Sequence, residues 1–183
     1  MTLAQEAMFD AVDRRAGDLA SFDQLMRQHE RLVLATSLRM LGNLEDAQDV
    51  SQEVFLKLYR NLRKLESEEH IRAWLYRVTV NVCHDLHRKR RPTAPVEEAD
   101  AVAASDPPRD LNAAEDRRSA LMLSLRRLSE KERAAVVLRD LEGLSTEEVA
   151  RALGSSEATV RSQISQARAK MREFLERYFR RRL

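Results

Sequence analysis

Apolar side chains recur at helical intervals in the last quarter of the chain. They lie on both sides of Gly154, at Val149, Leu153, Val160, Ile164, Ala167 and Met171. This spacing predicts two amphipathic helices joined by a tight turn. Ser145 and Glu148 have the spacing of a capping box that begins the first helix, Gly154 suits a left-handed turn that ends it, and Ser155 or Ser156 can cap the second helix. This order of signals is that of a helix-turn-helix.

The second of these predicted helices, over residues 157–172, carries polar side chains on the flank opposite its apolar face. Steps of about 100° per residue place on this flank Arg161, Ser162, Ser165, Gln166 and Arg172. Such side chains can hydrogen-bond base edges and phosphates. A polar helix flank is often only solvated surface, so the pattern favours DNA binding but does not define the class of protein.

Two further amphipathic helices are predicted between residues 20 and 62. The first has one buried face, which ends at Gly42-Asn43 and is formed by Phe22, Leu25, Met26, His29, Leu32, Val33, Thr36 and Met40. The second, from about Leu44 to Leu62, buries Ala47, Val50, Val54 and Leu58. It presents to solvent a flank that is acidic at its start and basic at its end, formed by Asp46, Asp49, Glu53, Lys57 and Arg60. This charge order suits the helix dipole, and Glu53 and Lys57 are spaced for an ion pair.

A third helix in this region is predicted from about Ile71 to Arg90. Its buried face is Ile71, Trp74, Leu75, Val78, Val82 and Leu86, and Tyr76 lies at the boundary with no assignment. The opposite flank carries Arg77, Asn81, His84 and Arg88, and the helix runs into a basic segment formed by His87, Arg88, Lys89, Arg90 and Arg91. This stripe is suited to a phosphate backbone, although a basic last turn also suits the helix dipole.

Composition places the chain among helical proteins. It has 183 residues, of which 43% are hydrophobic and 5% aromatic, so its cores must be aliphatic and modest. Four glycines and four prolines are too few for a fold with many turns, and no alternating run predicts a strand. The chain is therefore predicted to be all-α.

An acidic segment separates the two helical regions. Residues 92–116 contain all four prolines and carry seven acidic residues against one arginine, a net charge of −6. A segment of this composition buries too little apolar surface to offset the conformational entropy that it would lose on folding, so we predict a flexible linker. The whole chain carries +2, so the remainder carries +8, a basic balance that suits a nucleic-acid partner. The expected organisation is an N-terminal arm (1–19), a helical domain (20–91), the linker (92–116) and a helix-turn-helix domain (117–183).

Other classes of chemistry find little support. The single cysteine, Cys83, fits a reducing cytoplasm, and with His84 and His87 it lacks a fourth ligand for zinc, so we expect no metal and no cofactor. The N-terminus has no secretory signal and no run is long enough for membrane insertion, which predicts a cytoplasmic protein. Neither a nucleophile with its base nor a glycine-rich phosphate loop is present, so an enzyme is not expected.

Three runs together resemble the extracytoplasmic-function (ECF) sigma factors of bacterial RNA polymerase. They are DAQDVSQEVFLKLYRNL at 46–62, IRAWLYRVTVNVCHDLHRKRR at 71–91, and LRRLSEKERAAVVLRDLEGLSTEEVARALGSSEATVRSQISQARAKMRE at 125–173. The resemblance covers both helical regions in order, with the acidic linker in the position that it has in the family. It implies a dissociable polymerase subunit with two promoter-reading domains and no catalytic chemistry.

The resemblance also implies residue roles. In sigma region 2 the contacts with core RNA polymerase would be Asp49, Gln52 and Glu53. The −10 element would be opened and read by the loop at 62–70 with Asn81, His84, Arg88, Lys89, Arg90 and Arg91. In sigma region 4 the −35 element would be read by Arg161, Ser162, Ser165, Gln166 and Arg172. The implied partners are core RNA polymerase and promoter DNA, with an anti-sigma factor as a further candidate.

One feature limits what can be carried over. Family members often have arginine in the recognition helix where this chain has Gln163 and Gln166, so the −35 sequence does not transfer.

The alternatives to a sigma factor are a conventional helix-turn-helix regulator that acts as a dimer, and a helical adaptor that does not bind DNA. A dimeric regulator predicts palindromic half-sites, whereas a sigma factor predicts an asymmetric site and dependence on core polymerase.

Overall fold

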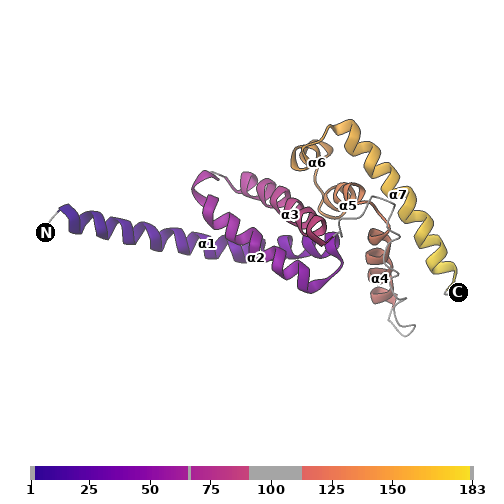
Figure 1. Cartoon of the computed structure of the whole chain (residues 1–183), viewed down its shortest axis with the longest axis horizontal. Helices are drawn as coiled ribbons and strands as arrows, with labels where there is room; N and C mark the ends of the chain where they lie inside the picture. Colours follow the sequence, from indigo (N-terminus) through magenta and orange to yellow (C-terminus); the bar gives the residue numbers. More distant parts are fainter. Residues whose placement is uncertain (1–2, 66, 91–112, 182–183) are drawn as a thin grey trace.

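The computed structural model describes residues 3–65, 67–90 and 113–181, and every regular element in these ranges is helical (Figure 1). The N-terminal domain consists of α1 (Leu3–Leu41), α2 (Leu44–Asn61), the 3-10 turn η1 (Leu62–Lys64) and α3 (Glu68–Arg90). The C-terminal domain consists of α4 (Ala113–Arg126), α5 (Glu130–Val136), the π-helical turn η2 (Val137–Leu141), α6 (Thr146–Leu153) and α7 (Glu157–Arg180). The prediction of an all-α fold is confirmed.

Two of the expected boundaries fall inside helices. Helix α1 is continuous from Leu3, so the expected change from arm to domain after residue 19 is not a break in the helix. Helix α4 begins at Ala113, so the last four residues of the predicted linker are helical. Among these, Asp116 accepts a hydrogen bond from Tyr178 Oη at 2.8 Å, which anchors the start of α4 to α7. The rest of the predicted linker lies outside the described residues.

The N-terminal domain is built on the apolar faces that the sequence predicts. Val33, Val54, Leu58 and Leu75 are fully buried where α1, α2 and α3 meet. Gly42 takes a positive φ of 71° to end α1, and the Asn43 side chain caps α2 by accepting from the Glu45 amide at 2.9 Å.

The helix-turn-helix is confirmed, together with its local signals. The Ser145 hydroxyl accepts from the Glu148 amide at 3.2 Å, and the Glu148 carboxylate accepts from the Ser145 amide at 2.6 Å, so the capping box is complete. Gly154 has a left-handed φ of 60°, and Ser156 rather than Ser155 caps α7. The second helix of the pair, α7, continues to Arg180, beyond the predicted end at 172.

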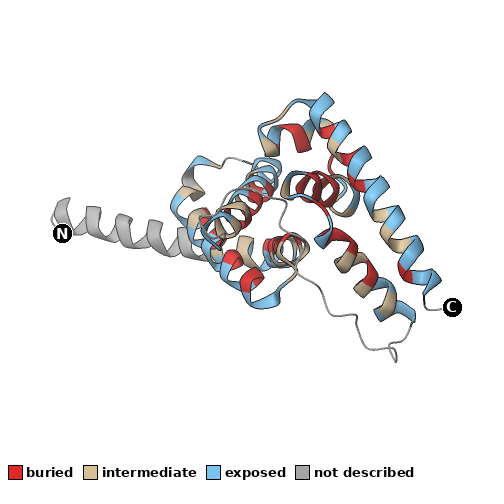
Figure 2. Cartoon of the chain, turned by 45° about the vertical axis from the view of Figure 1, so that its right-hand side comes forward, coloured by how far each residue is buried: buried red, intermediate tan, exposed pale blue. Residues whose placement is uncertain are grey.

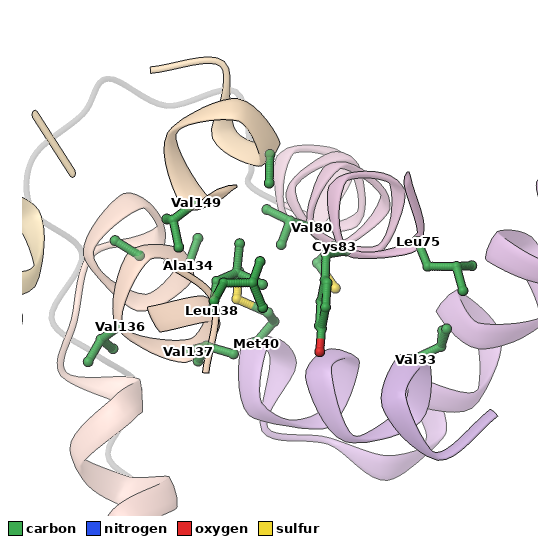
Figure 3. Close-up of a cluster of buried hydrophobic side chains, with 14 of the residues drawn as sticks. Val33, Met40, Leu75, Val80, Cys83, Ala134, Val136, Val137, Leu138 and Val149 are labelled. Carbon is green, nitrogen blue, oxygen red and sulfur yellow. The ribbon is translucent and has the colours of Figure 1, made fainter. Parts of the chain in front are cut away.

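The two domains share one hydrophobic core. Met40, Val80 and Cys83 from the N-terminal domain lie in the same buried cluster as Ala134, Leu138 and Val149 from the C-terminal domain (Figure 3). Helix α3 contacts both its own domain and α6. It therefore has a second apolar face, which includes Tyr76, Val80 and Cys83, in addition to the face that the sequence predicts.

The left-handed turn of the helix-turn-helix gives a stability prediction. Nothing lies within 4 Å of a Cβ placed at Gly154, so substitution there acts through backbone conformation alone. Gly154→Ala should lower the free energy of unfolding by about 1–2 kcal/mol, whereas Gly154→Asn should cost less because asparagine tolerates this conformation. Urea denaturation followed by circular dichroism measures both variants. Equal stability of the alanine variant and the native chain would contradict this account of the turn.

Candidate functional site

The polar flank of α7 is open to solvent along the predicted positions. Arg161, Ser162, Ser165, Gln166 and Arg172 are all exposed, while Val160, Ile164 and Ala167 on the opposite side are buried (Figure 2). Arg161 pairs with Glu157 at 2.9 Å, one turn earlier on the same helix. An exposed pair of this kind is weak, so the guanidinium can leave it for a base edge or a phosphate. The flank has the size and chemistry of a surface that enters the major groove.

Two cations of α7 hold the helix in place, a role that helical periodicity does not indicate. The Arg168 guanidinium donates to both carboxylate oxygens of Asp140, at 2.8 and 2.6 Å. Lys170 Nζ lies 2.8 and 3.0 Å from the carboxylate oxygens of Glu132. Burial raises the pKa of Glu132, but hydrogen bonds from Lys170 and Ser129 outweigh it and lower the pKa overall, so the pair is ionic. These contacts fix the polar flank relative to α5 and η2.

The polar flank of α3 is only partly open. Arg77, Asn81, Arg88 and Lys89 are exposed, and Arg88 pairs with Asp85 at 2.9 Å. His84 is half-buried beside Glu130 at the start of α5. Burial lowers the pKa of His84, an effect that Glu130 partly opposes, so this ring is neutral at pH 7 and adds no charge to the stripe.

Arg90 has a partner that the periodicity did not indicate. The sequence places Asp46 on the solvent flank of α2, and this prediction is wrong because Asp46 is buried. Its carboxylate accepts two hydrogen bonds from the Arg90 guanidinium, one of them at 2.6 Å, which joins the end of α3 to the start of α2. Arg90 is thus engaged within the domain in this arrangement. Arg91 lies outside the described residues.

The described residues between α2 and α3 make local hydrogen bonds on both sides of residue 66. After η1, the Leu65 amide donates to the Leu62 carbonyl at 3.2 Å. The Ser67 hydroxyl accepts from the His70 amide at 3.2 Å, which supports the first turn of α3. The loop therefore leads directly into the first turn of α3.

Helix α2 presents a mixed acidic and apolar face. Asp49, Gln52 and Glu53 are exposed as predicted, and Glu53 pairs with Lys57 at 2.9 Å. Leu56 and Tyr59 are also exposed, at 58% and 47%, although the sequence reasoning did not select them. The sequence does contain a signal for Leu56, because it is a large apolar side chain that lies one turn after Gln52 on a polar flank. Acidic groups around exposed apolar side chains are typical of a protein-binding surface.

The fold and these surfaces are those of a two-domain helical protein with a helix-turn-helix, in which α2 carries a mixed acidic and apolar face. Residues 25–93 match the family model for sigma-70 region 2, and residues 118–171 match the model for sigma-70 region 4. The chain is 38% identical over 176 residues to the ECF RNA polymerase sigma factor SigE of Mycolicibacterium smegmatis, covering 94% of this chain and 68% of that protein. It is 36% identical over 162 residues to SigM of Mycobacterium tuberculosis, covering 87% and 80% respectively. The chain therefore belongs to the ECF sigma factors of bacterial RNA polymerase.

Solved structures share the fold. CnrH, in complex with the cytosolic domain of CnrY, matches with a TM-score of 0.64 and 29% identity over 91% of this chain and 94% of that chain. The sigma factor RpoE of Bartonella quintana, in complex with the anti-sigma factor NepR, matches with a TM-score of 0.65 and 22% identity over 85% and 97%. Both matches span the N-terminal and C-terminal domains. In the described parts of the chain, no helix is both long and apolar enough to cross a bilayer.

The contact between Asp46 and Arg90 gives a prediction for DNA binding. Asp46→Asn weakens the hold on Arg90 and frees a cation at the end of α3. Non-specific DNA affinity should rise, and the plot of log K against log salt should steepen by roughly 0.9 for one added phosphate contact. Fluorescence anisotropy over a salt series measures this slope. Adding Arg90→Ala to Asp46→Asn is the control and should remove the gain, and an unchanged slope in the single variant would show that Arg90 does not reach phosphate.

Proposed function

We propose that this protein is an alternative sigma factor that brings core RNA polymerase to specific promoters through three separate surfaces. The observation that carries the proposal is the order of the two sigma regions on two helical domains, each of which exposes a polar helix flank. The protein acts as a regulatory subunit and needs no catalytic group of its own. Because it works with polymerase, its expected location is the cytoplasm.

The exposed face of α2 is the proposed contact with core polymerase. Asp49, Gln52 and Glu53 supply charge and hydrogen-bonding groups, and Leu56 supplies apolar area. In protein–protein interfaces with an apolar centre and a charged rim, burial of the centre supplies affinity and the surrounding charges orient the partner. We therefore add Leu56 to the three residues expected from the sequence.

Helix α3 is the proposed reader of the −10 element. Promoter opening requires bases to leave the stack, at a cost of a few kcal/mol, and a protein without ATP must recover this cost by binding the displaced strand. Asn81 can hydrogen-bond a base, while Arg88 and Lys89 can hold the phosphate backbone. The adjacent loop at 62–70 is the proposed site for the extruded base.

Helix α7 is the proposed reader of the −35 element. Arg161 suits the acceptor pair of guanine, and Gln166 suits the donor and acceptor of adenine. Ser162, Ser165 and Arg172 complete the flank with groups that can contact phosphate or base edges.

An anti-sigma factor is the proposed negative regulator. Two proteins of the same fold, CnrH and RpoE, were solved in complexes with the cytosolic domain of CnrY and with the anti-sigma factor NepR. A similar partner would bind this chain and compete with core polymerase for it.

The α2 surface leads to a test of core binding. The double variant Asp49→Lys with Glu53→Lys should weaken association with core polymerase and leave helical content unchanged, because both side chains face solvent. A pull-down with purified core measures the loss. Glu30→Lys is the matched control for each single substitution, Asp49→Lys or Glu53→Lys, since it makes the same change of charge at an exposed position on α1. Undiminished binding by the double variant would rule out this face.

The recognition helix leads to a test of −35 binding. Arg161→Ala should cost about 1–3 kcal/mol on the matched duplex and relax sequence preference if Arg161 contacts a base edge. Binding to matched and scrambled duplexes separates a base contact from a phosphate contact, which would weaken both alike. Arg151→Ala is the control, because Arg151 is an exposed arginine on α6 with its own partner one turn away, Glu147 at 3.4 Å. If Arg161→Ala binds both duplexes as well as the control does, α7 is not the reading helix.

A further inference from the structure

A further exposed side chain, His70, lies on the line of the polar flank of α3. It belongs to the first turn of the helix. At about 100° per residue, it lies within about 20° of Arg77 and Asn81 around the helix axis and in line with Arg88. The polar flank of α3 therefore runs from the first turn of the helix to its last turn.

Local contacts fix the backbone of this first turn. The His70 amide donates to the Ser67 hydroxyl at 3.2 Å, and Gln28 Nε2 of α1 donates to the Glu68 carboxylate at 2.5 Å. The next residue, Ile71, is 7% exposed and belongs to the hydrophobic core. No hydrogen bond or ion pair joins the His70 side chain to another described residue. The backbone position is thus set in advance, while the imidazole ring stays exposed for a ligand, which keeps the ordering cost of binding low.

The other aromatic rings of α3 are held within the protein. Trp74 is half-buried and packs against the core, and Tyr76 is 3% exposed. His84 and His87 are half-buried as well. Among the rings of this helix, His70 is therefore the one that can lay a face against a nucleic-acid base.

Charge distinguishes the two ends of the flank. The first turn of α3 carries Glu68 and Glu69, whereas the last turn includes Arg88 and Lys89. Carboxylates repel phosphates, so a DNA strand can be held electrostatically only toward the end of α3. A base is flat and uncharged, and an exposed imidazole can stack on it without a nearby cation. The first turn is therefore suited to a base and the last turn to the sugar-phosphate backbone.

We propose that His70 is the stacking platform for one base of the opened −10 strand. The proposal rests on the proposed function of α3 and adds His70 to the reading flank. At about 1.5 Å per residue, His70 and Asn81 lie roughly 16 Å apart along the helix. This separation equals about five steps of a stacked strand at about 3.4 Å each. The two side chains therefore contact different bases: Asn81 recognises one by hydrogen bonds, and His70 holds another by its flat face. Because stacking tolerates any base, His70 contributes to promoter opening more than to sequence preference.

The test uses the full chain bound to core polymerase. The promoter is selected from a random-sequence library by transcription with the native chain and core. The binding probe is a fork of this promoter, in which the −10 strand is single and carries 2-aminopurine at each position in turn. His70→Ala should weaken fork binding about fivefold to thirtyfold. One probe should be brighter in the His70→Ala complex than in the native complex, because its base loses a stacking partner. Binding to a −35 duplex and to core polymerase should stay unchanged.

Two matched variants separate stacking from hydrogen bonding. His70→Phe keeps a flat ring without a hydrogen-bonding group and should bind the fork at least as tightly as the native chain. His70→Gln keeps hydrogen-bonding groups without a ring and should lose as much affinity as His70→Ala. Circular dichroism checks that each variant is folded.

Three results would overturn the stacking platform. They are native fork binding by His70→Ala, native fork binding by His70→Gln, and a loss of binding in His70→Phe equal to that in His70→Ala. If no promoter can be selected with the native chain and core polymerase, the proposed function itself is overturned.

Discussion

The arrangement of this chain depends on one buried guanidinium. Arg133 donates to the Leu125 carbonyl at 2.8 Å, to the Leu128 carbonyl at 3.1 Å and, across the domain contact, to the Met40 carbonyl at 2.6 Å. Burial lowers the pKa of Arg133, and nearby Glu130 partly offsets this effect. The group stays charged because arginine titrates far above neutral pH. Its charge is compensated by the negative ends of α1 and α4, whose last carbonyls it also satisfies.

This compensation explains how a cation can be buried at the contact between the two domains. A buried charge is costly unless hydrogen bonds replace its hydration. The planar guanidinium can reach carbonyls in several directions at once, which a lysine ammonium on a flexible stem does less well. The turn between α4 and α5, the end of α1 and the start of the C-terminal core are therefore fixed by the same side chain.

Local features of the sequence were sufficient to predict α2, α3, α6 and α7, but α4, α5 and the contacts between elements were not predicted. The capping box at Ser145 and the left-handed Gly154 depend on residues within one turn, and both were predictable. The second apolar face of α3 was missed because Val80 and Cys83 contact a domain that is distant in sequence. Asp46 was assigned to solvent because helical periodicity says nothing of Arg90, which lies 44 residues further along the chain. The exposed polar flank of α7 was predictable, since the apolar face opposite it defines where it must lie.

The π-helical turn η2 and the residue that follows it contact two different parts of the protein. The Glu142 amide donates to the Val137 carbonyl, five residues earlier, at 3.0 Å, so one residue more than an α-helical turn needs is accommodated here. With this extra residue, Asp140 meets Arg168 on α7 while Glu142 meets Arg39 on α1. Neighbouring acids thus contact opposite sides of the same segment, one of them holding α7 and the other joining the two domains. A substitution at Glu142 therefore removes a contact between the domains and leaves in place the ion pair that positions α7.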